Sequence, residues 1–118
     1  MTAINPSNAF QARCSVIHIP PAEPVFLTNR GFSRVRRDTS LVPNGGYILT
    51  LDNPEFDFDL NALVGTYNTE AGNDLGVLFF GHLPAVPLNN EFSVVRFQVI
   101  PGNTPIDGNF QVAIINLQ

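Results

Sequence analysis

The chain has 118 residues, a net charge of −4 and only 14% charged residues, against about 25% in an average soluble domain. This length suits one domain with its own core, and the weak acidity argues against binding nucleic acid by counterion release. A single cysteine, Cys14, excludes an internal disulfide, and no apolar run reaches the about 18 residues that a membrane span needs.

The chain begins with a polar, turn-prone stretch. Residues 1–9 carry no positive charge and no apolar block, so we expect an N-terminal arm rather than a signal peptide. Such an arm is either free or laid on a partner. We expect residues 10–118 to form a single β-sandwich domain.

Residues 10–19 alternate between apolar and polar side chains, which predicts a strand. Cys14 lies on the apolar face of this strand. It is interpreted as a small core residue, because a catalytic cysteine needs a histidine and an exposed, electropositive site. His18 shares the face but lies too far along the strand to bond to Cys14. The proline-rich residues 20–24 form a stiff connector.

An arginine-rich strand follows. Residues 25–28 are predicted to form a strand, residues 29–31 a bulge or turn, and residues 32–37 a further strand with Phe32, Arg34 and Arg36 on one side. Three interpretations stay open for this side: a solvated edge guarded by charge, a surface that pairs with an acidic neighbour, or a nucleic-acid site.

Residues 44–46, Asn-Gly-Gly, are a strong turn signal, and residues 47–52 then alternate as a strand. Residues 55–60 also alternate, which predicts another strand with an apolar side and an acidic side. The apolar side comprises Phe56, Phe58 and Leu60, and the acidic side comprises Glu55, Asp57 and Asp59. Calcium is one possible occupant, but EF-hand spacing is absent. The preferred interpretation is an acidic stripe that complements Arg34 and Arg36 across a subunit boundary.

Residues 62–69 and 75–83 resemble the two arms of a hairpin. The second arm is apolar on both faces, so both faces must be covered, and a two-layer domain covers only one. The spare face is therefore a candidate oligomer interface, formed by Leu78 and Phe80 and ending at His82. We interpret His82 as a packing residue rather than a ligand or base.

Residues 91–100 and 110–117 are predicted to pair through a tight loop and to close the domain. In the first arm, Val95, Phe97 and Val99 are expected to face the core. The expected outer face comprises Phe92, Val94, Arg96, Gln98 and Ile100. In the second arm, the expected inward residues are Phe110, Val112 and Ile114.

About eight short strands separated by Gly, Pro and Asn turns predict an all-β fold, an antiparallel β-sandwich that is jelly-roll-like. The chain shows no helical period, no phosphate-binding glycine loop and no catalytic triad pattern. We therefore expect neither an enzyme nor a cofactor or metal.

Two segments also resemble a known class of domain. The run VIPGNTPIDGNFQVAI at 99–114 is similar to the closing strands of small β-domains in tailed-phage virion proteins and in complement-globular-head-like trimers. The strand GYILTLD at 46–52 is similar to a mid-domain strand of the same domains. The resemblance implies a non-catalytic homotrimer. Because only a short arm follows Met1, with no shaft, it favours a capsid decoration (cement) protein over a fibre head.

The sequence thus leads to two functional expectations. The first is a structural virion protein, made in the host cytoplasm, that binds the major capsid protein or another virion protein and neither nucleic acid nor membrane. The alternative is a receptor- or glycan-binding head that recognises its target through loops 68–74 or 102–107. The candidate interface residues are Arg34, Arg36, Asp57, Asp59, Leu78, Phe80, His82, Phe92 and Ile100.

Overall fold

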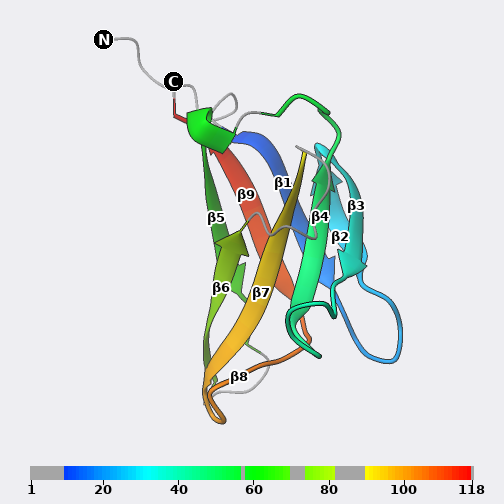
Figure 1. Ribbon diagram of the computed structural model, residues 1–118, viewed down its shortest axis with the longest axis vertical. Coiled ribbons are helices and arrows are strands. Elements are labelled where there is room, and N and C mark those ends of the chain that lie inside the picture. Colours follow the sequence, from blue (N-terminus) through cyan, green and yellow to red (C-terminus); the bar gives the residue numbers. More distant parts are fainter. Residues whose placement is uncertain (1–9, 57, 70–73, 82–89, 118) are drawn as a thin grey trace.

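The structure, a computed structural model, describes residues 10–56, 58–69, 74–81 and 90–117 (Figure 1). The expected arm at residues 1–9 lies outside this part of the chain. So do two of the candidate interface residues, Asp57 and His82.

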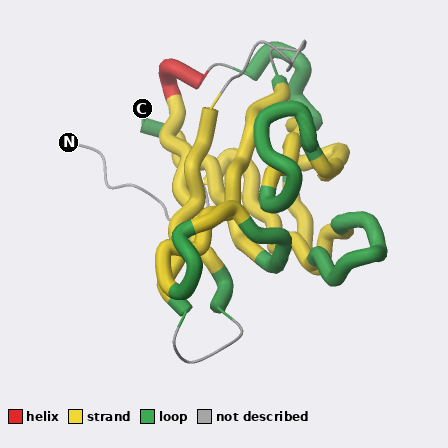
Figure 2. The backbone as a smooth tube through the Cα atoms, turned by 60° about the horizontal axis from the view of Figure 1, so that its bottom comes forward, coloured by secondary structure: helices red, strands yellow, loops and turns green. Residues whose placement is uncertain are grey.

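The described residues form nine strands in two antiparallel sheets packed face to face (Figures 1 and 2). The β1 sheet has the order β2 (Val25–Arg30), β1 (Phe10–Ile17), β9 (Phe110–Asn116), β5 (Asn61–Tyr67). The β7 sheet has the order β3 (Phe32–Arg37), β4 (Gly46–Leu51), β7 (Glu91–Ile100), β6 (Leu75–Gly81), and the short β8 (Thr104–Pro105) also pairs with β7. The predicted all-β sandwich is confirmed.

The chain crosses repeatedly from one sheet to the other. β5 pairs with β9 whereas β6 pairs with β7, so the hairpin predicted from residues 62–69 and 75–83 is wrong. The predicted pairing of the two terminal arms is wrong as well, because β7 and β9 lie in different sheets. A strand that is apolar on both faces can pack in either sheet. A turn signal predicts where the chain reverses direction, but it does not predict whether the next strand joins the same sheet or the other one.

The expected interruption at residues 29–31 is a corner at which the chain changes sheets, from β2 to β3. Gly31 has φ +94°, and an added Cβ there would lie 2.8 Å from the Cβ of Ala12. The Asn29 side chain holds the corner, because its amide donates to the Phe32 carbonyl at 2.7 Å and accepts from the Phe32 N–H at 3.0 Å.

The core lies between the sheets and confirms several predicted faces. In β1, Ala12, Cys14 and Val16 are buried, and in β9 the three expected inward residues are also buried. The full set of buried residues in this cluster is Ala12, Cys14, Val16, Phe32, Tyr47, Leu49, Leu51, Leu78, Phe92, Val94, Phe110, Val112 and Ile114.

The orientation predicted for β7 is reversed. Phe92, Val94 and Arg96 are buried between the sheets, whereas Val99 is 38% exposed on the outer side. The charge on Arg96 suggested an outward position. Its guanidinium is nevertheless buried because backbone carbonyls satisfy it, as described below.

In the segment 55–60, the described residues (all but 57) do not form the predicted strand. A single 3-10 turn, Phe58–Leu60, follows an irregular stretch, and Leu60 is 41% exposed. The rings of Phe56 and Phe58 pack edge to face with centroids 4.8 Å apart, and Phe58 also contacts Phe92 at the rim of the core. The predicted apolar side is therefore kept for Phe56 and Phe58, which pack against the core, but not for Leu60.

Candidate functional site

An apolar surface covers the outer side of β6 and β7. Val77 and Phe79 are 39% and 54% exposed, and the Phe79 ring packs edge to face on Phe97 with centroids 5.8 Å apart. Leu75 and Ile100 extend it at the ends of the same strands. We call this surface the apolar face. Contiguous exposed apolar side chains of this kind mark sites of protein association.

A spare apolar face on β6 was predicted, but on the opposite side of the strand. Leu78 is 8% exposed and belongs to the core, and Phe80 packs partly buried against the core. Phe92, at 1% exposure, is also a core residue. These three residues are therefore corrected from interface candidates to packing residues, because their side of each strand faces the β1 sheet.

One pair of charges on the β7 sheet is neutralised within the chain. The Arg36 guanidinium lies 3.3 Å from the buried Glu91 carboxylate, which also accepts from the Thr50 hydroxyl at 3.0 Å. Arg36 therefore already has a partner and is not free to meet an acidic stripe. Arg34 and Asp59 are exposed, and their pairing across a subunit boundary stays a prediction.

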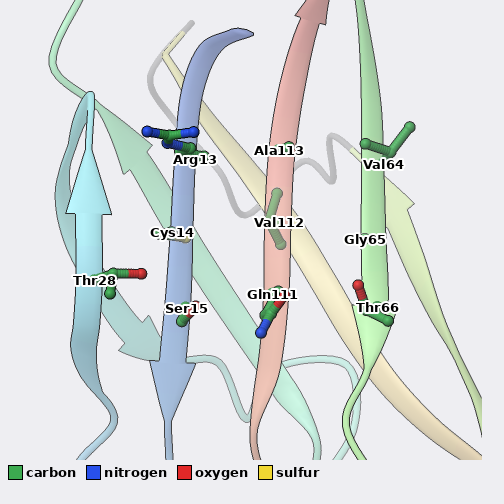
Figure 3. A pocket seen from close by; sticks show the side chains of 10 residues that line it. All are labelled: Arg13, Cys14, Ser15, Thr28, Val64, Gly65, Thr66, Gln111, Val112 and Ala113. Atoms are coloured by element: carbon green, nitrogen blue, oxygen red, sulfur yellow. The ribbon is translucent and has the colours of Figure 1, made fainter.

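The outer side of the β1 sheet carries a second surface, a shallow hollow of about 340 Å³ (Figure 3). Four polar side chains lie in one register row across all four strands of this sheet: Thr28, Ser15, Gln111 and Thr66. Arg13, Ala113 and Val64 form the next row. The hollow therefore combines hydroxyl and amide groups, a cation and two small apolar side chains. We call it the polar hollow.

Two arginines stand directly opposite each other at one side of the polar hollow. Arg13 on β1 is the register partner of Arg30 on β2, so both side chains project from the same outer face. Both also line an adjoining depression of about 160 Å³, together with Thr28 and Asn29. Across the described residues, no acidic group forms an ion pair with either arginine. Sequence reasoning missed this pair because a register between strands is not visible in one strand.

A buried polar cluster joins the two sheets at one end of the core. His18 Nδ1 and the Tyr47 hydroxyl share a hydrogen bond of 2.6 Å, and the Gly108 N–H donates to the same hydroxyl at 3.1 Å. Asp107 Oδ1 lies 3.8 Å from His18 Nδ1 and accepts from the Gly45 N–H at 2.6 Å, while Oδ2 lies 3.3 Å from the Arg37 guanidinium. Burial raises the pKa of Tyr47 to about 12, and the nearby Asp107 charge acts in the same direction. The cluster therefore runs from the buried His18 and Tyr47 to the partly exposed Arg37 at the surface.

Arg96 fixes the loop that leads into β9. Its guanidinium donates to the carbonyls of Asn68 at 2.7 Å, Asn109 at 2.9 Å and Ile106 at 3.2 Å. It also lies 3.9 Å above the ring of Tyr67. One buried cation thus replaces water for several loop carbonyls. Loop 102–107 was predicted as a surface for target recognition. Hydrogen bonds from Arg96 therefore anchor its end.

Cys14 is confirmed as a core residue. Burial raises the pKa of its thiol to about 12, which favours the protonated thiol over the thiolate at neutral pH. Within the described ranges no three His, Cys, Asp or Glu side chains gather as metal ligands, and no helix is long and apolar enough to cross a membrane.

Comparisons with known proteins do not identify the chain: no family model, no curated protein and no solved structure gives a significant match.

Proposed function

We propose that the protein is a non-enzymatic structural protein that self-associates through the apolar face and acts as a capsid decoration protein of a tailed phage. The observation that carries the proposal is the apolar face itself. Phe79 and Leu75 are each more than half exposed on a sheet whose other side already forms the core. A second copy of the chain can cover the apolar face without any rearrangement of the core.

The surroundings of the apolar face favour burial. Glu91 is 4% exposed and already paired with Arg36, so an interface there would not strand an unpaired charge. Burying a whole leucine or phenylalanine side chain contributes about 1.5–3 kcal/mol, so each half-exposed side chain of the apolar face contributes roughly half of that when it becomes fully buried. A cluster of several such side chains suffices for a stable core of an interface, with polar residues at its rim.

The virion setting and the trimeric state rest on the resemblance of residues 46–52 and 99–114 to phage β-domains. A decoration protein binds only the assembled shell, and anything that binds one state alone shifts the equilibrium toward that state.

The first experiment is light scattering of the purified chain across a dilution series. We expect a stable trimer for the native protein and a monomer for Phe79→Asp, which places a charge in the middle of the apolar face. Leu41→Asp is the matched control, because Leu41 is 58% exposed in the loop between β3 and β4. A native monomer, or a trimer that Phe79→Asp leaves intact, would show that the apolar face does not mediate assembly.

The virion role is tested separately. We expect the native protein to co-sediment with expanded phage capsids and to raise the temperature at which they open. Protein that remains in the supernatant at micromolar concentration would remove the decoration role while leaving self-association to stand.

A further inference from the structure

We propose that the polar hollow binds an acidic saccharide, with a carboxylate or sulfate group held between Arg13 and Arg30 and sugar hydroxyls bonded along the row from Thr28 to Thr66. This site lies on the β1 sheet, whereas the apolar face lies on the β7 sheet. The proposal therefore does not depend on self-association.

The arginine pair supplies the first argument. Like charges directly opposite on neighbouring strands destabilise a sheet, and an anion bound between the two guanidinium groups would remove this repulsion. Arg36, Arg37 and Arg96 all have partners inside the chain. Arg13 and Arg30 have no acidic partner in the described part of the chain. Two guanidinium groups offer the planar, forked donors that match a carboxylate or sulfate.

The polar row supplies the second argument. Ser15, Thr28 and Thr66 each present a hydroxyl that both donates and accepts, and Gln111 presents an amide that does the same. Ligands rich in hydroxyls need partners with this dual capacity. Adjacent strands lie about 4.8 Å apart, so four strands set the groups along about 14 Å. Because the groups stand on paired strands rather than loops, their spacing is fixed before binding.

Shape supplies the third argument. A hollow of about 340 Å³ is within the range of about 300–1,000 Å³ found for small-ligand sites. Ala113 and Val64 lie in register with Arg13 and give the hollow an apolar side against which the C–H groups of a sugar ring can pack. The competing explanation is that Arg30 merely guards the edge strand β2 against aggregation, which predicts no ligand at all.

The test is titration of the full chain with trigalacturonate, followed by NMR chemical shifts or calorimetry. Its fully methyl-esterified form serves as a neutral ligand with the same hydroxyls. We expect millimolar or tighter binding of the acid and at least about tenfold weaker binding of the ester. Arg13→Gln and Arg30→Gln should each weaken binding of the acid about tenfold, and Thr66→Val should weaken it less. Arg34→Gln, an exposed arginine on the β7 sheet, is the matched control and should bind as the native protein does.

Titrations with other anions test whether the site prefers an acidic saccharide, a simple inorganic anion or an acidic polypeptide. Inorganic sulfate that binds as tightly as trigalacturonate, with no effect of Thr66→Val, would reduce the site to a bare anion site and overturn the saccharide assignment. Triglutamate that binds as tightly would move the assignment to acidic polypeptides. No binding of any anion, or equal weakening by Arg34→Gln, would overturn the proposal entirely. The titration is repeated with Phe79→Asp, the variant expected to be monomeric. Binding of trigalacturonate that is unchanged in this variant shows that the polar hollow does not need self-association.

Discussion

His18 and Tyr47, 29 residues apart in the chain, meet in the core with His18 Nδ1 2.6 Å from the Tyr47 hydroxyl. Their rings stand at 90° to each other with centroids 5.4 Å apart. His18 follows β1 and Tyr47 belongs to β4, so this contact ties one sheet to the other. The Tyr47 hydroxyl also receives the Gly108 N–H, which fixes the entry to β9. One phenol therefore organises three distant segments.

Tyr47→Phe should lower the free energy of unfolding by about 1–3 kcal/mol, because it leaves the buried Gly108 N–H and His18 Nδ1 without their partner. Urea unfolding followed by circular dichroism measures the change. Tyr67→Phe is the control, since it keeps the ring below Arg96 and should change stability little. Equal losses for both variants would mean that the Tyr47 hydroxyl does not hold the sheets together.

Stability should fall at alkaline pH. Burial raises the pKa of Cys14 from 9.0 to about 12 and that of Tyr47 from 10.0 to about 12. The unfolded chain thus loses these protons at a lower pH than the folded chain does. The stabilisation is complete below about pH 9 and is lost as the pH rises toward 12, at up to about 1.4 kcal/mol per pH unit for each group.

Urea unfolding at a series of pH values between 8 and 11 measures this slope. Tyr47→Phe should flatten it above pH 10, and Cys14→Ala should flatten it from pH 9. If neither substitution changes the slope of stability against pH, the slope must come from groups other than Cys14 and Tyr47.

Arg96→Met should destabilise the fold by about 3 kcal/mol, because the apolar side chain removes the guanidinium donors from the part-buried carbonyls of Asn68, Asn109 and Ile106. Thermal unfolding provides the measurement. Arg34→Met, at an exposed position of β3, is the matched control and should stay within about 0.5 kcal/mol of the native protein. A small effect at Arg96 would indicate that water replaces its guanidinium.

Local features of the fold could be predicted from the sequence, because they depend on neighbours in the chain. Alternation identified the strands at 10–19, 47–52 and 110–117 and the buried faces of the first and the last of them, and Gly45 takes φ +82° in the predicted turn. The sheet change at Gly31 was also marked as an interruption. These features follow from the period of two along a strand and from the conformations open to glycine.

Features that depend on sheet partners could not be predicted in the same way. β6 and β7 are apolar on both sides, so alternation did not say which side of each faces the core. Arg96 misled the assignment of β7, since its carbonyl partners come from loops at 68 and 106–109. The same limit applies to the polar hollow, whose rows exist only once four strands are in register. Its alternating polar residues were visible, but the opposition of Arg13 and Arg30 was not.

The two sides of β6 can be told apart by truncating neighbouring residues. Leu78→Ala should lower the free energy of unfolding by about 2–5 kcal/mol, because Leu78 lies in the core, 8% exposed, against Gly65 of the other sheet. Val77→Ala, at a 39% exposed position, should cost less than about 1 kcal/mol in the monomer. Urea unfolding in the Phe79→Asp background removes the contribution of self-association from both values. If Val77→Ala proved the costlier substitution there, the apolar face would lie inside the domain and Leu78 would lie on its surface.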